Sequence, residues 1–221
     1  NWPGGDDNMQ AMDLSARVRR IGESATLKVT RRAMQMKAQG IDVVDFGAGE
    51  PDFASPAVAV EAARQALADG FTKYTQNQGI PALRQALAKR YAQRYGAPWT
   101  ADQTLIAVGG KGALFEVALA LFEEGQEVVL HTPAWVSIPE QIRFAGATVV
   151  EVPTTGADGF AVDPDAMLAA ITARTRAVIV NSPCNPTGGR ISPAAMTVII
   201  EGCAARGVLA ISDETYERLV Y

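Results

Sequence analysis

Two polar segments directly follow short apolar runs, and they carry the residues best suited to chemistry. Residues 177–180 form an apolar run, and the polar loop 181–189, which contains Asn185, follows it at once. Asp213 directly follows a second apolar run, 208–212. Such runs are typical of strands buried on both faces, and open α/β sheets bind ligands at the carboxyl ends of these strands. An amide and a carboxylate are therefore expected at one sheet edge, although an isolated Asn-Pro-Thr-Gly segment is also typical of an ordinary turn.

In two further segments, a predicted strand is followed by residues that could bind a ligand. Gly110 and Lys111 follow the apolar run 104–108 and begin a predicted helix, where free backbone N–H groups would favour an anion such as phosphate. This glycine-rich segment matches neither a P-loop nor a G-x-G-x-x-G motif. Trp135 follows the expected strand 127–131, and packing against the sheet alone is the alternative for it.

Alternating strands and helices are expected to position these residues. The order predicts an α/β fold, a doubly wound and mostly parallel sheet with helices on both faces. In the predicted helix 80–95, the stripe Leu83, Leu87 and Tyr91 is expected to be core. The expected strands are 41–46, 104–108, 127–131, 147–152, 177–180 and 208–212, and the expected helices include 24–39, 56–69, 80–95, 163–171 and 193–206.

Composition excludes several classes of function. The 221 residues are 48% hydrophobic and 20% charged with a net charge of −4, so charge gives no reason to expect binding to nucleic acid or to an anionic membrane. Cys184 and Cys203 have no metal-ligand spacing, and a reducing cytoplasm is the expected location. His131 is the one histidine, so a Ser-His-Asp triad or a zinc site is not expected. We expect a structural role for this histidine, at the end of a strand.

Asn185, Asp213 and Tyr216 together resemble the core signature of the fold type I pyridoxal-phosphate enzymes, within which the chain is most similar to the bacterial aspartate aminotransferases. The resemblance implies that Asp213 pairs with the pyridine nitrogen of pyridoxal 5′-phosphate. Asn185 and Tyr216 would bond to the ring oxygen. A carboxylate at the pyridine nitrogen keeps it protonated, which lets the ring accept electrons from the substrate.

The same resemblance assigns roles to residues elsewhere in the chain. Gly110 and Lys111 would donate backbone amides to the cofactor phosphate, and Trp135 would stack on the pyridine ring. Tyr74 would cross the interface of a homodimer to reach the cofactor phosphate of the other subunit; packing under its own loop is the alternative. The implied substrate-binding residues are Gly49, Trp135, Asn185, Lys111 and Thr26. Of these, Gly49 would lie beside the substrate α-carboxylate, and the Lys111 side chain, with Thr26 packed over the site, would meet a second carboxylate.

The resemblance also implies a division of the chain. Residues 1–11 are expected to be a flexible tail, 12–48 an N-terminal arm with part of the small domain, and 49–221 a large cofactor-binding domain that is incomplete. The family's Schiff-base lysine and its carboxylate-binding arginine have no match here, since the lysines stand at 28, 37, 73, 89 and 111.

The implied function is that of a transaminase, which moves an amino group from an amino acid, aspartate or glutamate, to a 2-oxo acid. Because the Schiff-base lysine has no match, these 221 residues alone are expected to be inactive. A fold type I lyase or synthase, such as a C–S lyase, is the alternative, and a binding or regulatory domain that reuses the fold is a third. No nucleic acid or membrane partner is expected.

Overall fold

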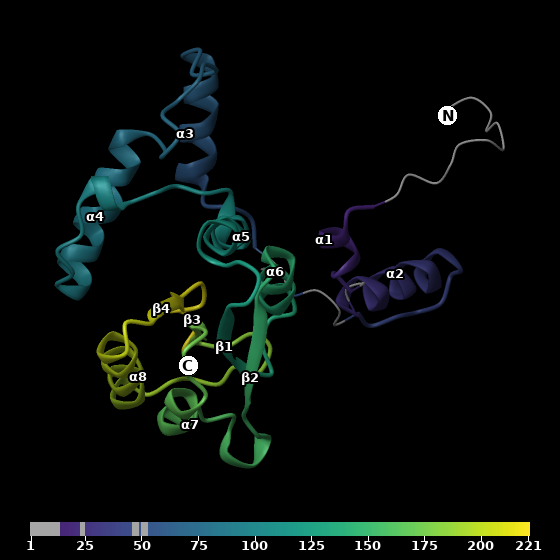
Figure 1. Cartoon of the computed structure of the whole chain (residues 1–221). Coiled ribbons are helices and arrows are strands. Elements are labelled where there is room, and N and C mark those ends of the chain that lie inside the picture. The colour runs from purple at the N-terminus through teal and green to yellow at the C-terminus, as the bar shows by residue number, and fades with distance from the viewer. Residues whose placement is uncertain (1–13, 23–24, 46–48, 50–52) are drawn as a thin grey trace. The chain divides into compact units, whose positions relative to one another are not determined.

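The computed structural model describes residues 14–22, 25–45, 49 and 53–221, and for residues 25–27 it describes the backbone alone. The chain forms two compact units (Figure 1). The first, here called the sheet unit, comprises Asn1–Gly22 and Gly109–Tyr221, and the second, the helical unit, comprises Glu23–Val108.

A four-stranded parallel sheet forms the centre of the sheet unit. Its strands are β1 (Glu127–Thr132), β2 (Thr148–Pro153), β3 (Thr175–Asn181) and β4 (Leu209–Asp213), in the spatial order β2-β1-β3-β4. All three neighbouring pairs are parallel. Strands of a parallel sheet are connected by crossovers, and helices supply them here as the sequence predicted. The predicted α/β fold is confirmed.

Helices cover both faces of this sheet (Figure 1). On one face, α5 (Gly109–Leu121) and α6 (Ser137–Ala145) pack against Val128, Leu130 and Ile179. On the other face, α7 (Pro164–Ala169) and α8 (Pro193–Ala205) pack against Val129, Val178 and Val180. Successive residues of β1 and β3 thus point to opposite cores, which explains their unbroken apolar runs.

The N-terminal segment of the sheet unit is held against α6. It contains the short helix α1 (Ala16–Arg19), and the Arg17 guanidinium lies 5.6 Å from the centroid of the Phe144 ring. The Gly22 N–H donates to the Glu140 carboxylate at 3.1 Å. A further 3₁₀ turn, η2 (Gly156–Asp158), follows β2.

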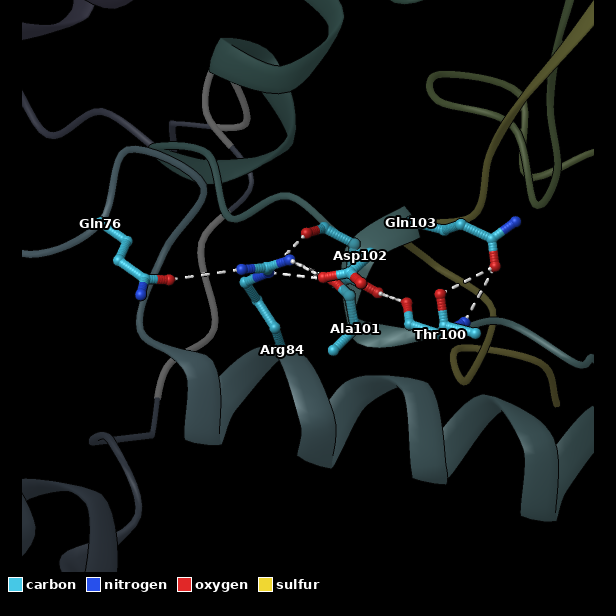
Figure 2. A network of polar contacts seen from close by, with 7 residues as sticks. Gln76, Arg84, Thr100, Ala101, Asp102 and Gln103 are labelled. Atoms are coloured by element: carbon cyan, nitrogen blue, oxygen red, sulfur yellow. Dashed lines mark hydrogen bonds and ion pairs between the residues drawn. The ribbon is translucent and has the colours of Figure 1, made fainter.

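The helical unit contains α2 (Ala25–Ala38), α3 (Ala57–Ala68), α4 (Pro81–Tyr95) and the 3₁₀ turn η1 (Ala101–Gln103). Arg84 of α4 is 5% exposed, and Figure 2 shows its guanidinium among the polar groups of η1. Its Nε donates to the carbonyls of Ala101 at 2.9 Å and Thr104 at 3.0 Å. One terminal nitrogen donates to Ala101 again at 2.6 Å, and the other lies 3.5 Å from the Gln76 amide oxygen. One buried cation therefore fixes η1 to α4.

Two predicted strands do not form in the part of the chain that the structure describes. Residues 41–45 and 104–108 have no ladder partner there, and residues 46–48 lie outside the described ranges. The Ile106 N–H bonds instead to the Gln78 carbonyl at 2.9 Å. An apolar, β-branched run favours extended backbone, but a strand needs a neighbour that accepts its ladder bonds.

The expected core stripe of α4 is also wrong in part. Leu83 and Tyr91 are 41% and 37% exposed, whereas Arg84 and Ala88 are buried. The turn η1 packs on the face that carries Arg84, because the guanidinium satisfies carbonyls that no apolar side chain could.

Candidate active site

A pocket lies in the sheet unit, where the carboxyl ends of β3 and β4 meet the N-terminus of α5. It brings together six residues that the sequence singled out and two that it did not. The predicted ones are Gly110, Lys111, Trp135, Asn185, Asp213 and Tyr216, and the additional ones are Asn181 and Thr215. Six cofactor-site predictions from four separate segments thus converge on one cavity.

The ends of β3 and β4 set the floor of this pocket. Asn181 and Asp213 are register partners in the parallel ladder, so both strands end at the same level. The Asn181 side chain donates from Nδ2 to the Asp213 carbonyl at 3.2 Å and accepts at Oδ1 from the Asn185 N–H at 2.9 Å. Asn181 is the first polar residue after the apolar run of β3, and that position was the signal that could have identified it.

Asp213 lines the pocket, and Thr215 holds one of its carboxylate oxygens. Its Oδ1 accepts from the backbone N–H of Thr215 at 3.1 Å and from the Thr215 hydroxyl at 2.8 Å. Its Oδ2 has no hydrogen-bond partner among the described residues, so it can accept one from a ligand. Thr215 therefore orients the carboxylate, and its position two residues after Asp213 is that of an Asx turn.

The N-terminus of α5 forms another wall. Gly109 has a left-handed φ of 72°, and a Cβ added to Gly110 would meet the Thr215 hydroxyl oxygen at 3.3 Å. The glycine therefore leaves open a space that any side chain would begin to fill. The first N–H groups of a helix lack intrahelical partners, and the helix dipole favours negative charge there. This corner of the pocket suits a phosphate.

Lys111 and Trp135 lie against each other at the pocket edge. The Lys111 ammonium is 4.9 Å from the centroid of the Trp135 ring, within the range of a cation–π contact. The Lys111 carbonyl accepts from the Gln141 amide of α6 at 3.0 Å. Thus the Lys111 backbone is fixed by α6 while its charged end reaches a face of the tryptophan that lines the pocket.

His131 lies beneath this floor, near the end of β1. It is 2% exposed, and its Nε2 accepts the backbone N–H of Asn181 at 3.1 Å. Burial lowers the pKa of His131 below its ordinary value. An Nε2 that accepts a hydrogen carries none itself, so the ring is neutral with its proton on Nδ1. The structural role predicted for this histidine is confirmed.

Three predicted site residues belong to the helical unit, and their relation to the pocket stays a prediction. Gly49 has no heavy atom within 4 Å of an added Cβ. Tyr74 is fully exposed. Thr26 lies in α2, and its side chain falls outside the described ones.

Two other kinds of site receive no support. No group of three or more metal-binding side chains lies together in the described ranges. Within those same ranges, no helix has the length and apolar character needed to cross a bilayer.

The fold and the pocket define a class, the large domain of a fold type I enzyme. The chain belongs to the aminotransferase class I and II family, and the sequence model of that family matches residues 41–221. This family depends on pyridoxal phosphate.

The similar proteins carry the names of aminotransferases. The chain is 45% identical over 208 residues to the aspartate/prephenate aminotransferase of Thermus thermophilus, covering 94% of this chain and 54% of that protein. It is 43% identical over 210 residues to an aspartate aminotransferase of Geobacillus stearothermophilus, covering 95% and 53%. The chain spans about half the length of the curated relatives that it matches.

Solved structures agree. The aspartate aminotransferase of Thermus thermophilus with maleate superposes with a TM-score of 0.91 at 44% identity, over 95% of this chain and 55% of that one. An alanine aminotransferase of Pyrococcus furiosus superposes with a TM-score of 0.90 at 28% identity, over 95% and 54%. The same fold therefore serves more than one named substrate.

The residues present fit the cofactor. The space above Gly110 and the helix N-terminus suit its phosphate, the Trp135 ring offers a flat apolar surface, and the unpartnered Asp213 Oδ2 offers an acceptor. Each feature answers a different part of pyridoxal phosphate, and all three lie in one pocket.

Proposed function

We propose that the protein carrying these 221 residues is an aminotransferase that moves the amino group of aspartate or glutamate to a 2-oxo acid, with pyridoxal 5′-phosphate as cofactor. The observation that supports this most is the convergence of Asn185, Asp213, Trp135 and the glycine-rich start of α5 on one pocket. The relatives are named as aminotransferases, so the lyase alternative is not favoured.

The residues of this pocket have distinct roles in the proposal. When bound, pyridoxal phosphate accepts the amino group and withdraws electrons from the substrate's α-carbon. Asp213 holds the proton on the pyridine nitrogen. Asn185 and Tyr216 bond to the ring oxygen, and Trp135 stacks on the ring.

The N-terminus of α5 completes the cofactor site and begins the substrate site. The backbone amides of Gly110 and Lys111 bind the phosphate. Gly49 allows the backbone to approach the substrate α-carboxylate, and Thr26 packs over the same site.

The Lys111 side chain selects the substrate. An ammonium near a helix N-terminus is electrostatically unfavourable, because the dipole there repels cations. The Trp135 ring at 4.9 Å offsets part of this cost and holds the ammonium at the pocket, where a second substrate carboxylate would pair with it. A dicarboxylic substrate is therefore preferred over a neutral one such as alanine.

The protein is further proposed to be a cytoplasmic homodimer in which Tyr74 of each subunit contacts the other subunit's cofactor. Tyr74 is fully exposed on a loop whose far end is fixed, since the Gln78 carbonyl accepts from Ile106 at 2.9 Å. Cys184 and Cys203 are both free thiols, which suits a reducing compartment.

Substrate kinetics of Lys111 variants test the proposal. The wild-type protein should turn over aspartate with 2-oxoglutarate. Lys111→Ala should lower kcat/KM for aspartate about 10- to 100-fold, the effect of one charge-assisted contact, and leave alanine almost unchanged. Lys111→Met keeps a long unbranched side chain without the charge and serves as the matched variant. If the charge alone matters, it should lose as much activity on aspartate as Lys111→Ala does. An equal loss on both substrates would show that Lys111 serves only the phosphate.

A further inference from the structure

The amide of Asn181 joins the two residues assigned to the cofactor ring. It lies between a backbone carbonyl, that of Asp213, and a backbone N–H, that of Asn185, at 3.2 and 2.9 Å. A carbonyl on one side and an N–H on the other allow only one orientation of the amide. Asn181 is only 2% exposed, so these bonds lie in a largely desolvated environment, where a hydrogen bond is stronger than in water.

The loop that carries Asn185 is attached to its surroundings through its first residues. The Ser182 N–H donates to the Asp213 carbonyl at 3.2 Å, and the Cys184 thiol donates to the Pro133 carbonyl at 3.5 Å. Two further bonds close the loop on itself: Cys184 N–H to the Gly189 carbonyl at 2.9 Å, and Gly188 N–H to the Cys184 carbonyl at 2.8 Å. In the described part of the chain, the bond to Asn181 Oδ1 is the one hydrogen bond that fixes the backbone of Asn185 to the sheet.

His131 holds Asn181 from the other side. The β1–β3 ladder ends at the pair Leu130 and Ile179, so the next N–H of β3 on that side, that of Asn181, needs another acceptor. His131 Nε2 supplies it at 3.1 Å. The end of β3 is therefore fixed by a side chain at the point where the two strands separate.

We propose that Asn181 is a positioning residue, supported by His131, that sets the Asn185 amide and the Asp213 carboxylate in their relative places for the cofactor ring. This proposal rests on the proposed function. Asparagine suits the task because it offers a donor and an acceptor on one rigid plane. Aspartate lacks the donor, and leucine lacks both groups.

A double-mutant cycle on cofactor binding tests this directly. The probe is pyridoxamine 5′-phosphate, which binds without a covalent bond, and its affinity is read from quenching of tryptophan fluorescence. Asn181→Ala should weaken binding about 10-fold in the wild-type background, because the Asn185 amide is no longer held. In an Asn185→Ala background the same change should weaken it by about 3-fold or less, because there is no side chain left to position. Equal effects in both backgrounds would overturn the proposal.

Two more variants separate positioning from loss of folding. Ser182→Ala removes a hydrogen bond of the same loop, from the Ile191 N–H at 3.0 Å, and should leave affinity within about twofold. Asn181→Leu keeps a side chain of similar size but lacks both polar groups, and the same cycle is run with it if Asn181→Ala does not fold. A wild-type protein that fails to bind the probe contradicts the proposed function, whereas an additive cycle with intact wild-type binding contradicts this inference alone.

Discussion

A single methyl group at Gly110 should weaken phosphate binding without weakening the fold. The Cβ of alanine at this position would have one neighbour within 4 Å, the Thr215 hydroxyl oxygen at 3.3 Å. Both residues line the pocket, so the methyl group would enter the space assigned to the phosphate. Thr215 would shift by a few tenths of an ångström, and its 2.8 Å bond to Asp213 would adjust with it.

The alanine at position 110 should affect folding stability much less than phosphate binding. Replacing glycine by alanine in a helix is worth up to about 1 kcal/mol, which offsets the tight contact with Thr215, so the melting temperature should change by only a few degrees. Losing one charge-assisted hydrogen bond costs about 1.5–3 kcal/mol, so the dissociation constant of pyridoxamine 5′-phosphate should rise about 10- to 100-fold.

The assay compares two ligands and two glycines. Affinity for pyridoxamine, which lacks the phosphate, should hardly change in Gly110→Ala. The control is Gly109→Ala: its Cβ meets nothing within 4 Å, but its φ of 72° disfavours a side chain. That variant should lose about 1–2 kcal/mol of folding free energy. If Gly110→Ala binds pyridoxamine 5′-phosphate as tightly as the wild type does, the phosphate does not lie at this corner.

Three further changes test other parts of the account. Asp213→Ala should reduce kcat by more than about 1000-fold but cofactor affinity only about 10- to 100-fold, because it removes the group that keeps the ring nitrogen protonated; a near wild-type kcat would place Asp213 elsewhere. The lowered pKa of His131 means that the unfolded chain binds a proton first as pH falls below about 6.5, so folding stability should decrease from there toward the folded-state pKa. The denaturant midpoint of His131→Gln should depend on pH less than that of the wild type. The same pH dependence in both proteins would contradict a buried neutral ring. Gly79→Ala should destabilise the helical unit more than Gly96→Ala does. Both glycines have positive φ, but only at Gly79 would the new Cβ fall 2.4 Å from a side-chain atom of Ile106. Equal losses of protection in hydrogen exchange for the two variants would refute the contact.

The sequence predicted much of the pocket because its residues stand at strand ends. Asp213 and Asn185 follow apolar runs, and parallel strands bring their carboxyl ends to one edge. Asn181 and Thr215 were missed because they act through the backbone and carboxylate of their neighbours. The contact of Asn181 with Asp213 depends on the β3–β4 register, which local sequence does not encode. The contact of Thr215 with Asp213 spans only two residues and belongs to a local Asx turn.

The failures in the helical unit have a different cause. Residues 104–108 have the composition of a strand, yet the Ile106 N–H finds its acceptor at Gln78 in a loop. Arg84 is charged and interrupts an apolar helix pattern, yet it is buried because several carbonyls converge on it (Figure 2). In both cases long-range hydrogen bonds decided the outcome over local hydrophobic periodicity.

Transfer of labelled nitrogen tests the central proposal most directly. The purified protein that carries this chain is supplied with pyridoxal phosphate, ¹⁵N-aspartate and 2-oxoglutarate, and the products are analysed by mass spectrometry. We expect ¹⁵N-glutamate and oxaloacetate in equal amounts, with no labelled ammonia. Release of labelled ammonia, or an absence of labelled glutamate, would contradict the assignment as an aminotransferase acting on aspartate.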